Sequence, residues 1–284
     1  MKAPSFAYAR PDKLEQVFAL LERHADNAKL LAGGQSLIAT LNLRLSEPEL
    51  LIDINGVPGL AGIRVENGVL RIGALTTHRE IEMSAEIANH LPLLAQAVPH
   101  IAHAAIRNVG TFGGSIVMAD PAAEYPACCV ALDAQFVVAA AKGERRIAAR
   151  EFFKGMYETA LKPGEVLVAG EFKLARGYRS CFLELARRRG DYAIVGIAAH
   201  GKCDGGKFSD LRLAFLSAGI APVLALRAAT ALEGKVFSTA AVAAAQAALG
   251  EDLDPPADLY SSSAAKLHLA RVLTGRALAA LAGA

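Results

Sequence analysis

Three long stretches of alternating apolar and polar residues occupy positions 179–187, 193–202 and 208–218. The turn-forming sequences Gly190-Asp191 and Asp204-Gly205-Gly206 separate them. Strands joined by such short connections pair antiparallel, because a parallel pair needs a crossover of a dozen residues or more. The pattern therefore predicts a three-stranded antiparallel sheet in the last third of the chain. Two alanine-rich segments, 238–249 and 260–282, predict helices beside this sheet.

Before residue 177 the chain alternates helix and strand signals instead. Positions 13–23 carry an apolar face typical of a helix, and short apolar runs at 29–32, 50–54 and 70–75 predict strands. One long helix is predicted from Leu93 to Arg107, between Pro92 and a glycine-rich stretch. These signals indicate an α+β protein, and 284 residues are enough for two domains. We place the boundary near Arg176-Gly177, which gives domains 1–176 and 177–284.

Charge and hydropathy exclude two classes of protein. The net charge is +2 and basic residues are dispersed, which argues against a nucleic-acid-binding face. The densest basic run, Arg187-Arg188-Arg189, suits a solvated strand end as well as an anion site. No apolar run approaches the eighteen residues of a membrane span, and the N-terminal residues lack the apolar core of a secretory signal. We therefore expect a cytoplasmic protein.

The metal-ligating residue types are not arranged as a metal site. No CxxC pair exists, so the sequence predicts neither a zinc ribbon nor an iron–sulfur cluster in this chain. His100 and His103 are three residues apart, but no third ligand is evident, and surface or core-capping roles are expected. Free buried thiols are expected at all four cysteines: Cys128, Cys129, Cys181 and Cys203.

Two glycine clusters carry the functional signal, at 32–36 (AGGQS) and 111–115 (TFGGS). Free backbone N–H groups, small hydroxyl side chains and a helix N-terminus suit a phosphate or a pyrophosphate. Neither cluster is a Walker A sequence or a GxGxxG motif. A Gly-Gly pair between a strand and a helix is most often a simple turn. Residue types alone thus indicate candidate phosphate-binding loops and leave the turn alternative open.

Four ordered motifs extend this interpretation. They are LAGGQSL (31–37) followed by LLIDIN (50–55), IRNVGTFGGSIVMADPAAEYPA (106–127), LKPGEVL (161–167) and RRRGDYAIVG (187–196). Together they resemble the FAD-binding medium subunits of the molybdenum hydroxylases, a family that includes the carbon monoxide dehydrogenases. The resemblance implies a vanillyl-alcohol-oxidase or PCMH-type FAD-binding domain, with subdomains of about 1–56 and 57–176. A C-terminal domain, 177–284, would then pack over the flavin.

The resemblance also assigns cofactor contacts to positions of this chain. The first loop would wrap the pyrophosphate, the segment at 101–102 would lie near the adenine, and the second loop would grip the diphosphate and the ribityl chain. Glu124 falls where relatives usually have an aspartate that binds the sugar-like chain, Leu167 would pack by the isoalloxazine, and Tyr192 would gate it. The implied FAD contacts are Lys29, Leu31, Ala32, Gly33, Gly34, Gln35, Ser36, Ile101, Ala102, Thr111, Gly114, Ser115, Glu124, Leu167 and Tyr192.

Three positions depart from the family pattern. Glu124 is one methylene longer than the usual aspartate, Ser115 stands where many relatives have asparagine, and Glu184 replaces a lysine that some relatives place near the flavin. None of these lies among the glycines of the two loops.

The resemblance implies an electron-transfer subunit that holds FAD non-covalently, with no catalytic and no metal-ligating residues of its own. A small subunit with two [2Fe-2S] clusters and a large molybdenum-cofactor subunit would be its partners, in a dimer of heterotrimers (a heterohexamer). Two alternatives remain at this point. One is a stand-alone FAD-dependent oxidase or reductase of the same fold, for which Tyr192 is the one candidate acid or base. The other is a non-enzymatic binding module. The organic substrate and the external electron acceptor stay open.

Overall fold

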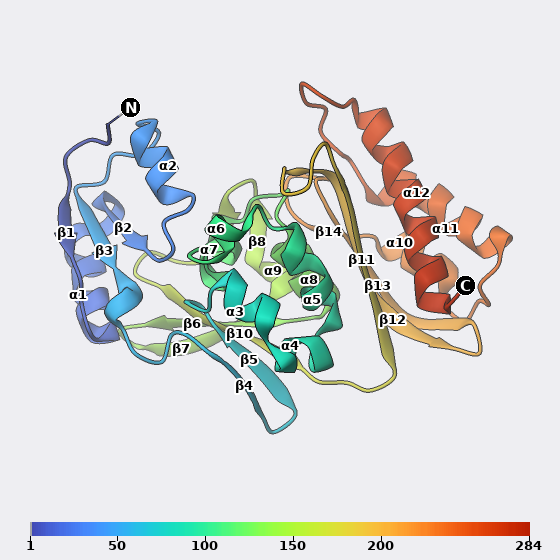
Figure 1. The fold of residues 1–284 in the computed structure, drawn as a ribbon, viewed down its shortest axis with the longest axis horizontal. Coiled ribbons are helices and arrows are strands. Elements are labelled where there is room, and N and C mark those ends of the chain that lie inside the picture. The colour runs from blue at the N-terminus through green and yellow to red at the C-terminus, as the bar shows by residue number, and fades with distance from the viewer. Residues whose placement is uncertain (1) are drawn as a thin grey trace.

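The structure is a computed structural model that describes residues 2–284. The N-terminal part forms a small parallel sheet in the order β1-β3-β2, with helix α1 packed against it (Figure 1). All four residues of β3 are buried, because this central strand is covered on both faces. The elements are β1 (Ala7–Ala9), α1 (Leu14–His24), η1 (Ala25–Asn27), β2 (Ala28–Leu31), α2 (Leu37–Asn42), β3 (Leu50–Asp53) and η2 (Ile54–Gly56).

A five-stranded antiparallel sheet in the order β4-β5-β10-β6-β7 forms the middle of the molecule. Strand β10 lies at its centre, and the pairing with β6 shifts register between Leu167 and Ala169. The strands are β4 (Ile63–Glu66), β5 (Val69–Gly73), β6 (Gln135–Ala140), β7 (Gly143–Ala148) and β10 (Val166–Lys173).

Short helices fill the space between this sheet and the C-terminal sheet (Figure 1, green). Helix α8 is buried from Tyr125 to Ala131, which explains its uninterrupted apolar sequence. The elements are α3 (His78–Met83), α4 (Ala85–His90), α5 (Pro92–Ala97), η3 (Val98–His100), α6 (Ala104–Arg107), α7 (Phe112–Met118), α8 (Glu124–Ala131), α9 (Ala149–Phe152), β8 (Phe153–Gly155) and β9 (Glu158–Thr159).

The prediction of a single long helix over 93–107 is wrong. Helix α5 ends at Ala97, a 3-10 turn containing Pro99 follows, and the chain leaves helical geometry at Ile101 before α6 begins. Pro99 has no N–H to donate, and Ala102 adopts a positive φ of 45°, which no helix accommodates. Ile101 and Ala102 therefore lie in a bend between helices and not on a helix face.

The predicted antiparallel sheet of three long strands is confirmed, and a two-residue strand extends it to the order β11-β12-β13-β14. One face, including Phe182, packs on the central helices, whereas the other face is covered by three helices, as Figure 1 shows. The helices predicted at 238–249 and 260–282 are confirmed as α11 and α12. The elements are β11 (Tyr178–Ala186), β12 (Ala193–Asp204), β13 (Lys207–Leu216), β14 (Val223–Leu224), α10 (Leu226–Leu232), α11 (Thr239–Asp252) and α12 (Ser263–Ala282).

The four cysteines are free and buried, as predicted. No helix in the described part of the chain combines the length and the apolar character needed to cross a membrane. Within residues 2–284, His, Cys, Asp and Glu side chains do not gather in groups of three that could hold a metal ion.

Candidate functional site

The first glycine loop, residues 32–36, connects the end of β2 to the start of α2. Gly34 has a φ of +69°, a conformation that glycine adopts without strain. A Cβ on Gly33 would lie 2.2 Å from the carbonyl oxygen of Val109 and 2.8 Å from the Cα of Gly110. The backbone of Gly33 is thus in direct contact with residues 109–110, which directly precede the second glycine cluster and lie more than seventy residues away in the sequence.

The backbone of this first loop is held in place through its carbonyl oxygens. Asn55 Nδ2 donates to the Ala32 oxygen at 3.0 Å, and Gln35 Nε2 donates to the Gly33 oxygen at 2.9 Å. Asn55 is fixed in turn by Asp53 Oδ1 at 2.7 Å. The N–H groups from Gly33 to Ser36 donate to no acceptor within residues 2–284. Consecutive free N–H groups on a fixed backbone form an anion-binding concavity.

The second loop uses its N–H groups differently. Thr111 caps α7 by accepting a hydrogen bond from the Gly114 N–H at 3.1 Å. The N–H groups of Phe112 and Gly113 donate to Thr76 and Ala74 oxygens, each at 2.8 Å. This loop is therefore tied to the segment after β5 and offers a ligand few free donors. Gly114 is exposed, and an added Cβ there would lie 2.9 Å from Thr111 Oγ1, closer than an ordinary contact. Glycine at this position avoids that collision, beside the half-buried Ser115.

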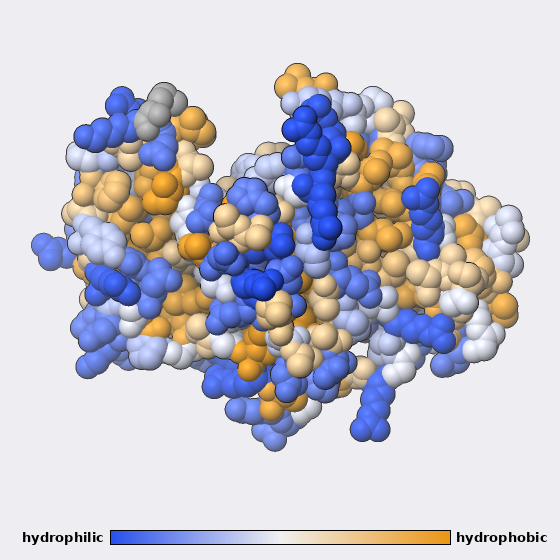
Figure 2. Space-filling view, viewed as in Figure 1, coloured by the Kyte–Doolittle hydropathy of each residue, from blue (hydrophilic) through white to orange (hydrophobic). Residues whose placement is uncertain are grey.

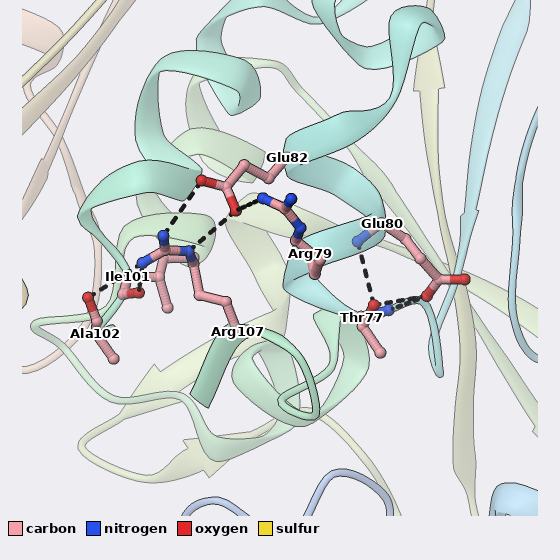
Figure 3. A network of polar contacts seen from close by, with 7 residues as sticks. All are labelled: Thr77, Arg79, Glu80, Glu82, Ile101, Ala102 and Arg107. Carbon is pink, nitrogen blue, oxygen red and sulfur yellow. Dashed lines mark hydrogen bonds and ion pairs between the residues drawn. The ribbon is translucent and has the colours of Figure 1, made fainter. Parts of the chain in front are cut away.

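Arg107 shapes the bend at Ile101 and Ala102. Its Nη1 donates to the Ile101 oxygen at 3.1 Å and to the Ala102 oxygen at 3.3 Å (Figure 3). Glu82 holds the same guanidinium through Nε and Nη2, both at 3.2 Å. A Cβ on Gly190 would lie 2.5 Å from the Ala102 oxygen. The tip of the β11–β12 hairpin thus packs on the bend that Arg107 maintains.

Tyr192 follows this hairpin tip and is 76% exposed. Partial burial of its hydroxyl, together with the charges of Asp120, Tyr157 and Glu124, raises its pKa. Tyr157 is 56% exposed and its N–H donates to the Ala119 oxygen at 3.2 Å, so it stands next to Asp120. Two exposed aromatic rings and two carboxyl groups therefore share one region. Figure 2 shows a hollow in the surface between the lobe that carries α2 and the middle of the molecule.

Glu124 is the first residue of α8, below this region. Burial is the main cause that raises its pKa, to about 8, and the charges of Glu184 and Asp120 add to the effect. At neutral pH the carboxyl group is mostly protonated, so it can donate a hydrogen bond where an ionised aspartate would only accept one.

The remaining predicted contacts are Leu167, Leu31 and Lys29. Leu167 is 4% exposed and belongs to the central core. Leu31 is half-buried, and its Cδ1 would lie 3.1 Å from a Cβ on Gly34. Lys29 lines a groove of about 680 Å³ with Glu22 and Arg145, and no residue of either glycine loop lines that groove.

Sequence reasoning missed three residues that position this site. Asn55 was visible inside LLIDIN, where a polar side chain directly after a buried strand is a signal for a structural hydrogen bond. Arg107 and Tyr157 carry no such signal: Arg107 is held by Glu82, 25 residues away, and Tyr157 lies near Tyr192, from another segment of the chain.

Comparisons with known proteins decide between the open alternatives. A family model described as the FAD binding domain in molybdopterin dehydrogenase matches residues 4–171. A second, described as the CO dehydrogenase flavoprotein C-terminal domain, matches residues 180–281. The chain belongs to this flavoprotein family. Its PCMH-type fold and its assignment as an FAD-binding subunit of a molybdenum-dependent oxidoreductase are thereby established.

Individual relatives cover the whole chain. The 6-hydroxypseudooxynicotine dehydrogenase complex subunit alpha of Paenarthrobacter nicotinovorans is 40% identical over 98% of this chain and 95% of that protein. The carbon monoxide dehydrogenase medium chain of Hydrogenophaga pseudoflava is 37% identical over 98% of this chain and 97% of its own length. Solved carbon monoxide dehydrogenase from the same organism matches with a TM-score of 0.96 at 38% identity, covering 99% of this chain and 98% of that one. Quinoline 2-oxidoreductase from Pseudomonas putida 86 gives 0.94 at 37% identity, covering 100% and 99%.

The residues present fit FAD. The free N–H groups of Gly33 to Ser36 suit a diphosphate, and the exposed rings of Tyr157 and Tyr192 suit an aromatic group nearby. In this flavoprotein family the molybdenum cofactor and the iron–sulfur clusters lie on other subunits.

Proposed function

We propose that this chain is the electron-transfer subunit of its complex. It takes electrons from [2Fe-2S] clusters of a small partner subunit and passes them to an external acceptor, while a large subunit holds the molybdenum cofactor. The observation that carries the proposal is the run of free N–H groups from Gly33 to Ser36, in a loop that contacts residues 109–110 just before the second glycine cluster. A flavin suits the task because it accepts electrons singly and releases them in pairs.

The residues of the chain have separate tasks in this proposal. The first loop binds the diphosphate through its backbone, and the second loop contributes the Thr111 and Ser115 side chains and the open surface of Gly114. Ile101 and Ala102 border the adenine end, in a bend that Arg107 holds. Lys29, Leu31 and Leu167 support these contacts from β2 and β10. Tyr192 covers the ring and admits the acceptor when it moves.

The proposed arrangement of the chain follows from the same reasoning. FAD lies in residues 1–176, between subdomains of about 1–56 and 57–176, and residues 177–284 pack over the flavin. Contact between Gly190 and Ala102 supports this arrangement, because it joins the C-terminal hairpin to the adenine-end segment. We further propose a dimer of heterotrimers.

Co-expression of the chain with its genomic neighbours tests the proposal. The purified complex should contain one FAD per copy of this chain, four irons in two [2Fe-2S] clusters and one molybdenum. Reduction by the organic substrate should bleach the clusters and the flavin in the same reaction. Flavin that stays oxidised while the clusters are reduced, or a chain that alone turns over an organic substrate, would refute the electron-transfer role.

A further inference from the structure

Ser217 is a buried polar residue in an unfavourable backbone conformation. It directly follows β13, it is 7% exposed, and its φ is +56°. Glycine adopts this left-handed conformation readily, but a serine there carries strain that its surroundings must offset. Strained residues of this kind gather at active sites and ligand clamps. The conformation of Ser217 therefore calls for an account of what its two polar groups hold in place.

Two hydrogen bonds hold Ser217 in this conformation. Its hydroxyl donates to the Ala193 oxygen at 2.7 Å, and its N–H donates to the Pro121 oxygen at 2.8 Å. The backbone ladder between β12 and β13 does not extend as far as Ala193, so the hydroxyl reaches beyond the paired part of the two strands. Because Ala193 directly follows Tyr192 in the chain, this bond fixes the backbone next to the tyrosine.

The segment 119–121, which binds the N–H of Ser217, is itself fixed in place. It directly follows α7, the helix that begins at the second glycine cluster. Ala119 ends α7 with a φ of 50°, and its oxygen accepts the Tyr157 N–H at 3.2 Å. Tyr157 has a φ of 59°, so three of the nine non-glycine residues with a positive φ within residues 2–284 belong to one hydrogen-bonded unit. This unit connects the hairpin that carries Tyr192 to the helix of the second loop.

We propose that Ser217 is a positioning residue for Tyr192, and that its hydroxyl fixes Ala193 as the point about which the end of the hairpin turns. The inference rests on the proposed function, from which it takes the covering role of Tyr192. The base of the hairpin keeps a constant position relative to α7 and the second loop, while the tip can move. Without the hydroxyl, the Ala193 oxygen loses its partner, the base shifts, and the covering position of Tyr192 is populated less. Loss of one hydrogen bond changes such an equilibrium by about two- to tenfold.

Ser217→Gly tests the hydroxyl without adding strain, because glycine adopts the positive φ freely. In the full chain loaded with FAD, the constant for quenching of flavin fluorescence by iodide should rise about two- to tenfold, up to the value of Tyr192→Ala. Ser217→Ala should raise this constant equally, but it should unfold at a lower temperature than Ser217→Gly, since the backbone strain remains. Asn67→Gly is the matched control, because it relieves a φ of 52° in the exposed turn between β4 and β5. It should leave the quenching constant unchanged.

The double variant separates positioning of Tyr192 from a purely structural role. In the Tyr192→Ala background, Ser217→Gly should have no further effect on quenching, because no ring remains to be positioned. A further rise in the double variant would overturn the inference and leave the proposed function intact. So would wild-type quenching in Ser217→Gly alongside increased quenching in Tyr192→Ala.

The same measurements reveal a failure of the proposed function. If Tyr192→Ala leaves the quenching constant unchanged, the covering role of Tyr192 is wrong, and the positioning role of Ser217 is wrong with it. None of these measurements needs electron flow, so they give the same answer for a chain that binds FAD and passes no electrons.

Discussion

Replacing Gly33 by alanine tests the contact on which the candidate site depends. The added Cβ would stand 2.2 Å from the Val109 oxygen and 2.9 Å from the Val109 carbonyl carbon. Ordinary contacts need about 3.5 Å, so the two loops must separate by roughly 1 Å. The φ of Gly33 is not positive, and the substitution therefore tests this collision without backbone strain.

The separation should weaken FAD binding strongly. If it breaks two charge-assisted hydrogen bonds from the first loop to the diphosphate, at about 1.5–3 kcal/mol each, binding loses about 3–6 kcal/mol. That corresponds to a dissociation constant roughly 10² to 10⁴ times larger. Overpacking should also lower the free energy of unfolding by about 1–3 kcal/mol.

Loss of FAD binding is measured by the flavin content per chain and by flavin fluorescence titration. Loss of stability is measured by thermal unfolding of the apoprotein. Gly250→Ala is the control, because its Cβ would meet only the end of the Arg271 side chain, at 3.3 Å. Gly114→Val tests the second loop: its Cβ would collide with Thr111 Oγ1 at 2.9 Å, so the variant should reduce flavin binding and also weaken the cap of α7. A Gly33→Ala protein with wild-type affinity for FAD would refute the contact between the loops as a requirement for binding.

Four further results are expected. Acid precipitation should release all of the flavin into the supernatant, since we expect non-covalent attachment; flavin retained in the pellet would contradict this. Arg107→Leu should free the Ile101 and Ala102 carbonyls and weaken FAD binding more than that of FMN, because only FAD has the adenine end. Folding raises the pKa of Glu124 from 4.5 to about 8, so the stability that the protonated carboxyl group contributes is present below pH 4.5 and is lost as the pH rises through 8. Between these two pH values, the unfolding temperature of the Glu124→Gln apoprotein should therefore fall less steeply than that of the unmodified apoprotein. Tyr192→Ala should retain FAD and leave reduction of the molybdenum site unchanged, while altering the rate at which external acceptors reoxidise the flavin; an unaltered rate per bound FAD would limit Tyr192 to packing.

Local patterns predicted those parts of the fold whose causes are local. The turns at Gly190-Asp191 and Asp204-Gly205-Gly206 and the strands between them were recognisable, because side-chain alternation and turn chemistry act within a few residues. The helix predicted over 93–107 failed for the opposite reason. Its bend at Ala102 is stabilised by Arg107, which is itself fixed by Glu82 from another helix.

The candidate site shows the same division between local and distant causes. Residue types alone identified two glycine loops with the chemistry for a phosphate. They could not show that the carbonyl of Val109 lies against Gly33 and leaves no room for a side chain there. Nor could they show that most N–H groups of the second loop already donate hydrogen bonds within the protein. In the structure, the backbone of Val109 and Gly110 fills the space that a side chain at position 33 would need.

In the proposed binding mode, this difference gives the two loops unequal parts. The first loop supplies donors, since its N–H groups are free and its carbonyls are held by Asn55 and Gln35. The second loop supplies a rigid surface, since the bonds from Phe112 and Gly113 fasten it to the middle sheet. Because Gly33 packs on the residues just before that surface, the donors are positioned by the same sheet that carries Leu167. In the proposed binding mode, the diphosphate and the flavin ring would share this rigid frame. The hairpin carrying Tyr192, which packs on the bend at Ala102 through Gly190, would be the element that moves when an acceptor approaches.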